Sequence, residues 1–383
     1  TVLIHVQHLL GIGHQRRAAL ISRELCRHGF NVCYVSGGFP VQGLDIGEAE
    51  LVQLPPARVG DAHYSALLDE QGNEVDDQWR ERRKAALLQT MDRVRPSVIF
   101  LESFPFGRKM LSFELLALLK AACELSPSPL VVSSVRDILE PKRKPGRNEQ
   151  IVEMIKRYFD LVLIHGDRRF VELSDSFALA AQIEDRMAYT GYVVEQTTGL
   201  GGNRESNQGV LISTGGGVGG EQLLKAAVAA RALVGAAPPV WRCMVGHTLP
   251  ESLYQELCLS APPGMVLERN RSDFFQLLSR AAVSVSQAGY NTVIEILVAG
   301  VPAVLVPFSE ANETEQRVRA SLLNSKGLAE LLCPHKLTPE NLLAAIEKAR
   351  LSSTGTAKTP DIDGAKRTAM IIKEQLRNKR SAA

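Results

Sequence analysis

The sequence predicts an α/β fold made of two domains, each built on a parallel β-sheet. Short apolar segments rich in β-branched residues alternate with longer amphipathic ones, as in "VLIHVQ" at 2–7 followed by "RRAALISRELCRHG" at 16–29. Continuous apolar strands separated by helices are typical of parallel sheets that are covered on both faces. The pattern restarts at "GVLISTGGG", residues 209–217. Because 383 residues exceed the usual size of one hydrophobic core, we expect two domains.

The expected strands follow the chain in order, with helices between them. In the first half they lie at 2–7, 31–36, 97–102, 129–135 and 160–166. In the second half they lie at 209–217, 240–247, 264–268, 281–287 and 301–308. Since two sheets of this kind bind ligands at the carboxyl ends of their strands, the loops that follow the strands are where we look for function.

The boundary between the domains is indicated by composition. Residues 189–209 are dense in Gly, Asn and Ser, which is typical of a linker. A second polar stretch at 351–360 precedes an amphipathic segment at the end of the sequence. We therefore expect an N-terminal domain at 1–195, a linker at 196–208, a C-terminal domain at 209–350, and a polar loop with a closing helix at 351–383.

Composition and charge exclude several classes of protein. A net charge of +2 from 44 basic and 42 acidic residues is too balanced for a general nucleic-acid binder. The six cysteines lie far apart without a CxxC pair, which favours reduced thiols over zinc or disulfides. The chain has neither a signal-peptide pattern nor an uninterrupted apolar run of about 18 residues. We expect a cytoplasmic protein with no metal and no cofactor.

Two loops of the second half have the features of a phosphate site. The segment "STGGGVGGEQLLKAA" leads from a strand into a helix through five glycines between 215 and 220, and no GK[ST] of a P-loop follows. Glycines let backbone amides approach an anion, and the helix N-terminus adds partial positive charge. A flexible turn is the alternative reading of this segment.

The second of these loops enters a helix at Gln287 to Thr292, after the expected strand at 281–287. Gly289 leaves space at the turn, and the amides of the next three residues point outward from the helix start. One turn further in, Glu295 is placed where a carboxylate accepts hydrogen bonds from the two hydroxyls of a ribose. The two loops together predict a nucleotide diphosphate site.

The block "SQAGYNTVIEILVAGVPAVLVPF" at 286–308 resembles the donor-binding signature of GT-B glycosyltransferases. The similarity covers about 210–335 and the opening loop of the first domain. It is greatest to the glycosyltransferase family 28 C-terminal type, in which a UDP-N-acetylglucosamine transferase acts in peptidoglycan synthesis, and to bacterial predicted glycosyltransferases of unassigned acceptor. The resemblance implies two Rossmann-like domains facing across a cleft. It also implies a UDP-sugar donor, and hence a role in cell-envelope or glycoconjugate synthesis.

Site residues are carried over from the same resemblance. Glu295 would hold the ribose diol, and the amides after Gly289 and in 215–217 would hold the diphosphate. Backbone groups of Asn270 and Arg271 would face the uracil, and Glu315 with Gln316 would bind sugar hydroxyls. The full implied donor set is Gly13, Thr214, Gly215, Gly216, Gly217, Asn270, Arg271, Gln287, Gly289, Tyr290, Asn291, Thr292, Glu295, Glu315 and Gln316.

The opening loop "GIGHQRR" lacks the third glycine of a GxGxxG pattern, and a histidine follows its second glycine. In similar enzymes this loop faces the donor, so His14 is our expected general base for an acceptor hydroxyl. A helix-start histidine bonded only to backbone is the alternative. Strand-end Glu102 and Asp137 would orient His14 or bind the acceptor, or else act as structural caps. Arg17 and Arg136 are expected on the acceptor side.

The activity we expect is an inverting, metal-independent transfer of a sugar from a UDP-sugar, or another nucleotide diphosphate sugar, to a hydroxyl acceptor. Because UDP-sugar hydrolases carry a similar GxGHxxR loop in which the histidine activates water, hydrolysis is one alternative. A non-catalytic nucleotide-sugar-binding protein is another. Peripheral membrane contact at the inner face, through Leu9, Leu10, Ile12 and 104–106, and a free monomer are both compatible with the sequence.

Overall fold

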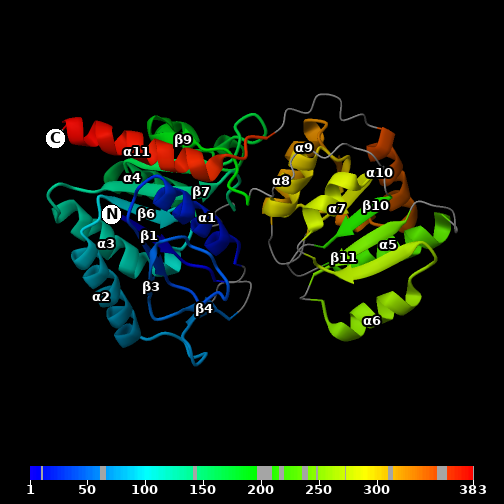
Figure 1. Cartoon of the computed structure of the whole chain (residues 1–383), viewed down its shortest axis with the longest axis horizontal. Helices are drawn as coiled ribbons and strands as arrows, with labels where there is room; N and C mark the ends of the chain where they lie inside the picture. Colours follow the sequence, from blue (N-terminus) through cyan, green and yellow to red (C-terminus); the bar gives the residue numbers. More distant parts are fainter. Residues whose placement is uncertain are drawn as a thin grey trace. The chain divides into compact units, whose positions relative to one another are not determined.

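The computed structural model describes residues 1–9, 12–60, 66–140, 145–195, 209–214, 220–234, 240–246, 249–271, 273–308, 314–351 and 360–382. The chain divides into two compact units (Figure 1). The first unit is Thr1–Glu195 together with Asp361–Ala383, and the second is Gln196–Pro360. The expected linker at 196–208 lies outside the described residues.

The first unit is built on a seven-stranded sheet with the order β3-β2-β1-β6-β7-β8-β9, in which neighbouring strands pair in parallel. Its strands are β1 Val2–Val6, β2 Val32–Ser36, β3 Glu50–Gln53, β6 Val98–Glu102, β7 Leu130–Arg136, β8 Leu161–His165 and β9 Met187–Tyr189. A short antiparallel pair is formed by β4 Arg58–Val59 and β5 Leu67–Leu68. The helices are α1 Gly13–Arg27, α2 Asp77–Val94, α3 Ser112–Glu124, α4 Arg147–Tyr158 and α11 Gly364–Ala382. Short 3-10 turns are η1 Lys109–Leu111, η2 Leu173–Asp175 and η3 Ala180–Arg186.

Alternating residues of the central strands supply the cores on the two faces of this sheet. In β1, Val2, Ile4 and Val6 join the core that includes Ile21 of α1, whereas Leu3 joins the core on the other face with Leu118 of α3. This period of two is the geometry of an extended strand. Both faces of β1 are therefore covered by a hydrophobic core, which is why apolar residues predominate along the whole strand.

The closing helix α11 belongs to the first unit, although 165 residues of the second unit, Gln196–Pro360, precede it. It packs beside α1, and Figure 1 shows it in red among the blue and cyan elements of that unit. Ala369 and Ile372 of α11 are buried in the core that also contains Val2. At the start of the helix the Gly364 amide donates to Tyr192 O at 3.0 Å. The chain therefore returns to the first unit after completing the second.

The second unit is built on a six-stranded sheet with the order β12-β11-β10-β13-β14-β15, again with parallel neighbours. Its strands are β10 Val210–Ser213, β11 Trp241–Val245, β12 Met265–Arg269, β13 Val283–Ser286, β14 Ala303–Leu305 and β15 Glu330–Leu331. Its helices are α5 Glu221–Val234, α6 Glu251–Ser260, α7 Phe274–Arg280, α8 Tyr290–Ala299, α9 Glu315–Ser325, α10 Pro339–Leu351 and the 3-10 turn η4 Pro334–Lys336. The expected α/β architecture with two parallel sheets is confirmed.

Candidate active site

The first unit has a topological switch point between β1 and β6. These strands are neighbours in the sheet, but the chain leaves them toward opposite edges: β1 leads to β2, and β6 leads to β7. In open α/β sheets, ligands bind outside the carboxyl ends of the strands at such a point. His14, in the first turn of the helix after β1, and Glu102, the last residue of β6, both lie there.

The His14 imidazole is hydrogen-bonded to the Glu102 carboxylate. Nδ1 of His14 lies 2.9 Å from Oε1 of Glu102. Nδ1 also lies 3.2 Å from Ser103 Oγ and 3.4 Å from Arg17 Nη2. Because the Glu102 carboxylate is the nearest of the three partners and only accepts hydrogen bonds, we assign the proton to Nδ1, which leaves Nε2 of the neutral ring with a lone pair. The His14 side chain is 20% exposed, while that of Glu102 is fully buried. The pair thus has the arrangement of a general base with its orienting carboxylate.

Four polar groups surround the Glu102 carboxylate. Besides His14, the guanidinium of Arg17 donates to Oε1, Ser103 Oγ donates to Oε1 at 3.2 Å, and Ser134 Oγ donates to Oε2 at 2.6 Å. Burial alone would raise the pKa of Glu102, but the Arg17 charge and the hydrogen bonds from His14 and Ser134 outweigh it and lower that pKa well below its usual range. Glu102 is therefore an ionised carboxylate inside the protein.

The environment of His14 favours the neutral ring. Burial and the positive charges of Arg108 and Arg136 lower the pKa of His14 from 6.5 to about 3, against the opposing effect of Glu102. Arg108 is part of the loop after β6, where Ser103 (φ 67°) and Arg108 (φ 58°) both adopt left-handed backbone. Such conformations in non-glycine residues are costly and cluster at functional sites. The His14 ring is thus neutral, with Nε2 unprotonated, at neutral pH.

The other first-unit residues singled out in the sequence lie around this pair. Arg17 is 3% exposed and holds Glu102 from inside, a position that differs from the acceptor contact expected for it. Arg136 reaches the first turn of α1, where its Nη2 lies 3.2 Å from the place a Cβ of Gly13 would take. Asp137 is buried, accepts from the Ile138 amide at 2.9 Å and packs beside Gly166, contacts that support a structural role.

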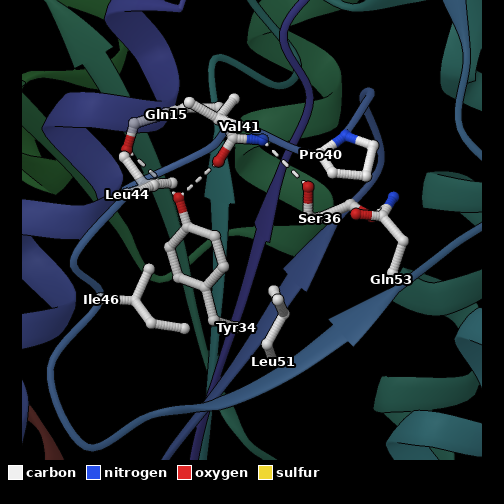
Figure 2. Close-up of a pocket in the computed structure, with 9 residues that line it drawn as sticks. All are labelled: Gln15, Tyr34, Ser36, Pro40, Val41, Leu44, Ile46, Leu51 and Gln53. Carbon is white, nitrogen blue, oxygen red and sulfur yellow. Dashed lines mark hydrogen bonds between the residues drawn. The ribbon is translucent and has the colours of Figure 1, made fainter.

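A small cavity adjoins the first turn of α1 on the side of β2 (Figure 2). It has a volume of about 90 Å³ and is lined by Gln15, Tyr34, Ser36, Pro40, Val41, Leu44, Ile46, Leu51 and Gln53. Tyr34 Oη donates to Gln15 Oε1 at 2.6 Å, and Gln15 Nε2 donates to Ser36 Oγ at 3.1 Å. These bonds fix the helix turn from which His14 projects.

The second unit has its own switch point between β10 and β13. Thr214 follows β10; it is 3% exposed, and its Oγ1 accepts from the Gly246 amide at 3.2 Å. Gln287 follows β13, and Gly289 is the N-cap of α8, so the first amides of Tyr290, Asn291 and Thr292 open this helix. Among the described residues, no heavy atom lies within 4 Å of the position that a Cβ of Gly289 would take. Gly215, Gly216 and Gly217 lie outside the described residues.

Three further residues of the expected donor set lie in the second unit, on β12–α7 and α8. Asn270 follows β12, and its amide donates to Val245 O at 3.1 Å. The guanidinium of Arg271 is paired with Asp273 at 2.7 Å. Glu295 is half-buried on α8. The roles expected for these residues stay predictions.

At the start of α9, Glu315 and Gln316 have different surroundings. Arg319 Nη2 donates to Glu315 Oε1 at 2.7 Å, and Arg319 Nη1 donates to Ala288 O at 3.1 Å. Gln316 Oε1 accepts from the Phe308 amide at 3.1 Å. Through Arg319, α9 is thus tied to the turn before α8. The sequence motif did not indicate this arginine, whose only signal is its position one helical turn after Glu315.

Two further expectations concern metals and membranes. Within the described ranges, His, Cys, Asp and Glu side chains form no group of three or more that could hold a metal ion. No helix in the part of the chain that the structure describes has the length and apolarity needed to cross a membrane. Leu9, Phe104 and Phe106 are at most 7% exposed, which does not favour membrane contact through these three side chains, whereas Ile12 is partly exposed. Phe106 instead packs edge-on against Phe177 at 5.3 Å, and Leu10 lies outside the described residues.

Part of the chain, mostly in the second unit, matches a known glycosyltransferase domain. Residues 270–375 match the glycosyltransferase family 28 C-terminal domain. Two similar proteins are both named UDP-N-acetylglucosamine--N-acetylmuramyl-(pentapeptide) pyrophosphoryl-undecaprenol N-acetylglucosamine transferase. The protein from Methylococcus capsulatus is 30% identical over 139 residues, which are 36% of this chain and 38% of the relative. The protein from Desulfitobacterium hafniense is 37% identical over 75 residues, 20% of each chain. The matches thus span less than half of these relatives.

Solved glycosyltransferase structures share the whole fold. MurG from Acinetobacter baumannii is similar with a TM-score of 0.63 and 16% identity over 98% of this chain and 99% of that one. CalG4, the calicheamicin glycosyltransferase, is similar with a TM-score of 0.62 and 17% identity over 99% of this chain and 94% of that one. These similarities confirm the expected GT-B fold and the resemblance to family 28.

Proposed function

We propose that this protein is an inverting, metal-independent glycosyltransferase that moves a sugar from a UDP-sugar to a hydroxyl acceptor. The observation that carries the proposal is the hydrogen bond between His14 Nδ1 and Glu102 Oε1, 2.9 Å long, at the switch point of the first unit. It leaves Nε2 of a partly exposed, neutral imidazole as a proton acceptor. A nucleotide-binding protein without chemistry has no need of such a pair.

In the proposed reaction, His14 Nε2 takes the proton of the acceptor hydroxyl as its oxygen bonds to the anomeric carbon. The bond between that carbon and the diphosphate oxygen breaks, and UDP leaves with the electron pair. Attack from the face opposite the leaving group inverts the anomeric configuration. Glu102 stays ionised and balances the imidazolium that forms.

The donor is assigned to the second unit. The amides that open α8 and the partial positive charge of its N-terminus favour an anion in front of Gly289. They would stabilise the negative charge that develops on the leaving diphosphate, which is the task of a metal ion in other transferases. The match of 270–375 to a glycosyltransferase domain covers α8 and α9 and supports this assignment.

The acceptor is assigned to the first unit, with a chemistry that its charges suggest. Arg108 and Arg136 both act on the charge of His14. Two cations beside the base favour an acceptor that carries a phosphate or carboxylate near its reacting hydroxyl. The relatives are named as transferases that act on a pyrophosphoryl lipid. Such an acceptor is anionic, which is consistent with this assignment.

The direct test is UDP release from a panel of UDP-sugars, with and without lipid and small-molecule acceptor pools. We expect release that depends on an acceptor and is lost in His14→Ala. Release without acceptor that is also lost in His14→Ala would make the protein a hydrolase. If no donor gives release, the protein uses another nucleotide or only binds one.

The assignment of Glu295 to the ribose gives a separate prediction. If its carboxylate accepts hydrogen bonds from the ribose hydroxyls, Glu295→Ala should lower kcat/KM for the UDP-sugar by about 10–100-fold, the effect of one or two lost charge-assisted bonds. The same substitution should have a smaller effect on the 2′-deoxy donor, which has only the 3′-hydroxyl left as a partner. Equal losses with both donors would contradict contact with the 2′-hydroxyl. Glu340→Ala is the control, because Glu340 is an exposed carboxylate in the first turn of another helix of this unit, α10.

A further inference from the structure

A chain of buried polar side chains leads from Glu102 across the next two strands. Ser134 Oγ lies 2.6 Å from Glu102 Oε2 and 2.8 Å from His165 Nε2. On the far side of the ring, His165 Nδ1 lies 2.9 Å from Thr190 Oγ1. Ser134, His165 and Thr190 are all 0% exposed. A hydrogen-bonded path therefore connects the candidate base to the interior of the first unit.

Strand register explains why these side chains meet. Glu102 of β6 is the partner of Ser134 in β7, and His165 ends β8, the next strand along. In each strand, every second residue before these side chains belongs to the core beneath α1, for example Phe100 before Glu102 and Val132 before Ser134. The three side chains thus lie on the sheet face that α1 covers, which is the face from which His14 and Arg17 approach.

The charge of Glu102 sets the direction of the hydrogen bonds next to it. An ionised carboxylate accepts only, and it is the strongest acceptor within reach of Ser134, so Ser134 uses its single proton on Glu102 in a charge-assisted bond. The Ser134 oxygen must then accept. His165 Nε2–H is the donor that lies next to it.

The direction continues on the far side of the His165 ring. Burial and the charge of Arg17 lower the pKa of His165 to about 3, so the ring is neutral and carries one proton. Since that proton is on Nε2, Nδ1 is an acceptor. The Thr190 hydroxyl lies 2.9 Å from Nδ1, and it also donates to Gly191 O at 2.8 Å and to Ile164 O at 3.3 Å, so these carbonyl oxygens share its single proton with Nδ1. The two donors next to Glu102, Ser134 and His165, thus point toward the carboxylate.

We propose that His165 is a positioning residue for His14. By donating to Ser134, His165 keeps the Ser134 proton on Glu102 Oε2, which turns Oε1 toward His14 Nδ1 and holds the proton of His14 on that nitrogen. Nε2 of His14 is thereby kept as the basic atom. The chemical consequence rests on the proposed transferase function, whereas the effect on His14 does not.

The test is the tautomer of His14, read from the nitrogen shifts of protein labelled with nitrogen-15 histidine. The His14 signals are identified by their loss in His14→Ala. We expect the Nδ1–H tautomer in the wild type and a larger share of the Nε2–H tautomer in His165→Leu and in Ser134→Ala. His165→Gln, which keeps a donor at the position of Nε2, should restore the wild-type ratio. An unchanged tautomer in His165→Leu would overturn the proposal, whatever the result for Ser134→Ala.

Ser133→Ala is the matched control. Ser133 is the neighbour of Ser134 in β7, is equally buried, and also loses one hydrogen bond, from its Oγ to Phe104 O at 2.7 Å. Its side chain lies on the other sheet face. A general loss of packing would affect both serine variants, whereas positioning affects only Ser134→Ala.

Kinetics separate this proposal from the function on which it rests. With a donor and acceptor that turn over, His165→Leu should lower kcat by about tenfold, the effect of weakening one charge-assisted bond, with KM changed by less than about twofold. A wild-type protein that turns over no donor would refute the function, and the tautomer measurement would still decide the positioning role. A changed tautomer with unchanged kcat would refute His14 as the base.

Discussion

His14→Ala should lower kcat for sugar transfer by about 10²–10⁴-fold, the usual contribution of a positioned general base. The donor KM should change little, because the donor contacts that the resemblance implies lie in the second unit, apart from Gly13. The measurement is steady-state UDP release at saturating acceptor. His28→Ala is the control, since His28 lies near the other end of the same helix and its Nδ1 bonds only locally, to Glu24 O at 2.8 Å. A loss of donor affinity with normal kcat would contradict the assigned role.

The pH dependence of the same rate is a second readout of His14. The base form is the neutral ring, which is present above the pKa and is lost as pH falls through it. Because the pKa of His14 is lowered from 6.5 to about 3, kcat/KM should stay level between about pH 8 and pH 5. A fall in rate centred near pH 6.5 would contradict this, because it would mean that burial and the neighbouring arginines do not lower the pKa of His14.

Much of the fold was accessible from the sequence because its central strands are buried on both faces. Segments such as "VLIHVQ" and "SVIFLE" have no polar face, so their apolar length alone indicates a strand. The edge strands were not predicted. β3 is Glu-Leu-Val-Gln and mostly exposed, and β15 is only Glu330–Leu331, so neither has enough apolar residues to form a recognisable pattern.

Only part of the candidate site could be predicted from the sequence, because its contacts depend on how the elements pack. The position of Glu102 at a strand end and of His14 after a glycine turn is visible in the sequence. The partners of Glu102 are not, since they depend on the rotation of α1 over the sheet and on the register of β6 against β7. Arg17 was therefore expected to face an acceptor, whereas it is buried on Glu102. Ser134 and His165 fall within two of the expected strands, 129–135 and 160–166, but nothing in the sequence connected them.

The ion pair between Arg17 and Glu102 gives the largest expected effect on stability. Both side chains are at most 3% exposed, so Glu102→Ala would leave the Arg17 guanidinium buried without its carboxylate. Removing one partner of a buried pair costs about 3–5 kcal/mol of unfolding free energy. The chain has two tryptophans, Trp79 in the first unit and Trp241 in the second. In a Trp241→Phe background, tryptophan fluorescence during urea unfolding thus follows the first unit alone.

The double variant Arg17→Met with Glu102→Leu separates the structural role of the pair from its chemical role. Apolar side chains of similar volume remove both buried charges, so most of the lost stability should return, to within about 1–2 kcal/mol of the wild type. Activity should not return, because His14 then has no carboxylate to hold its Nδ1 proton or to balance the imidazolium. We expect kcat to stay lower by about 10²–10⁴-fold. A stable double variant with wild-type kcat would mean that Glu102 only anchors Arg17, and that His14 works without an orienting carboxylate.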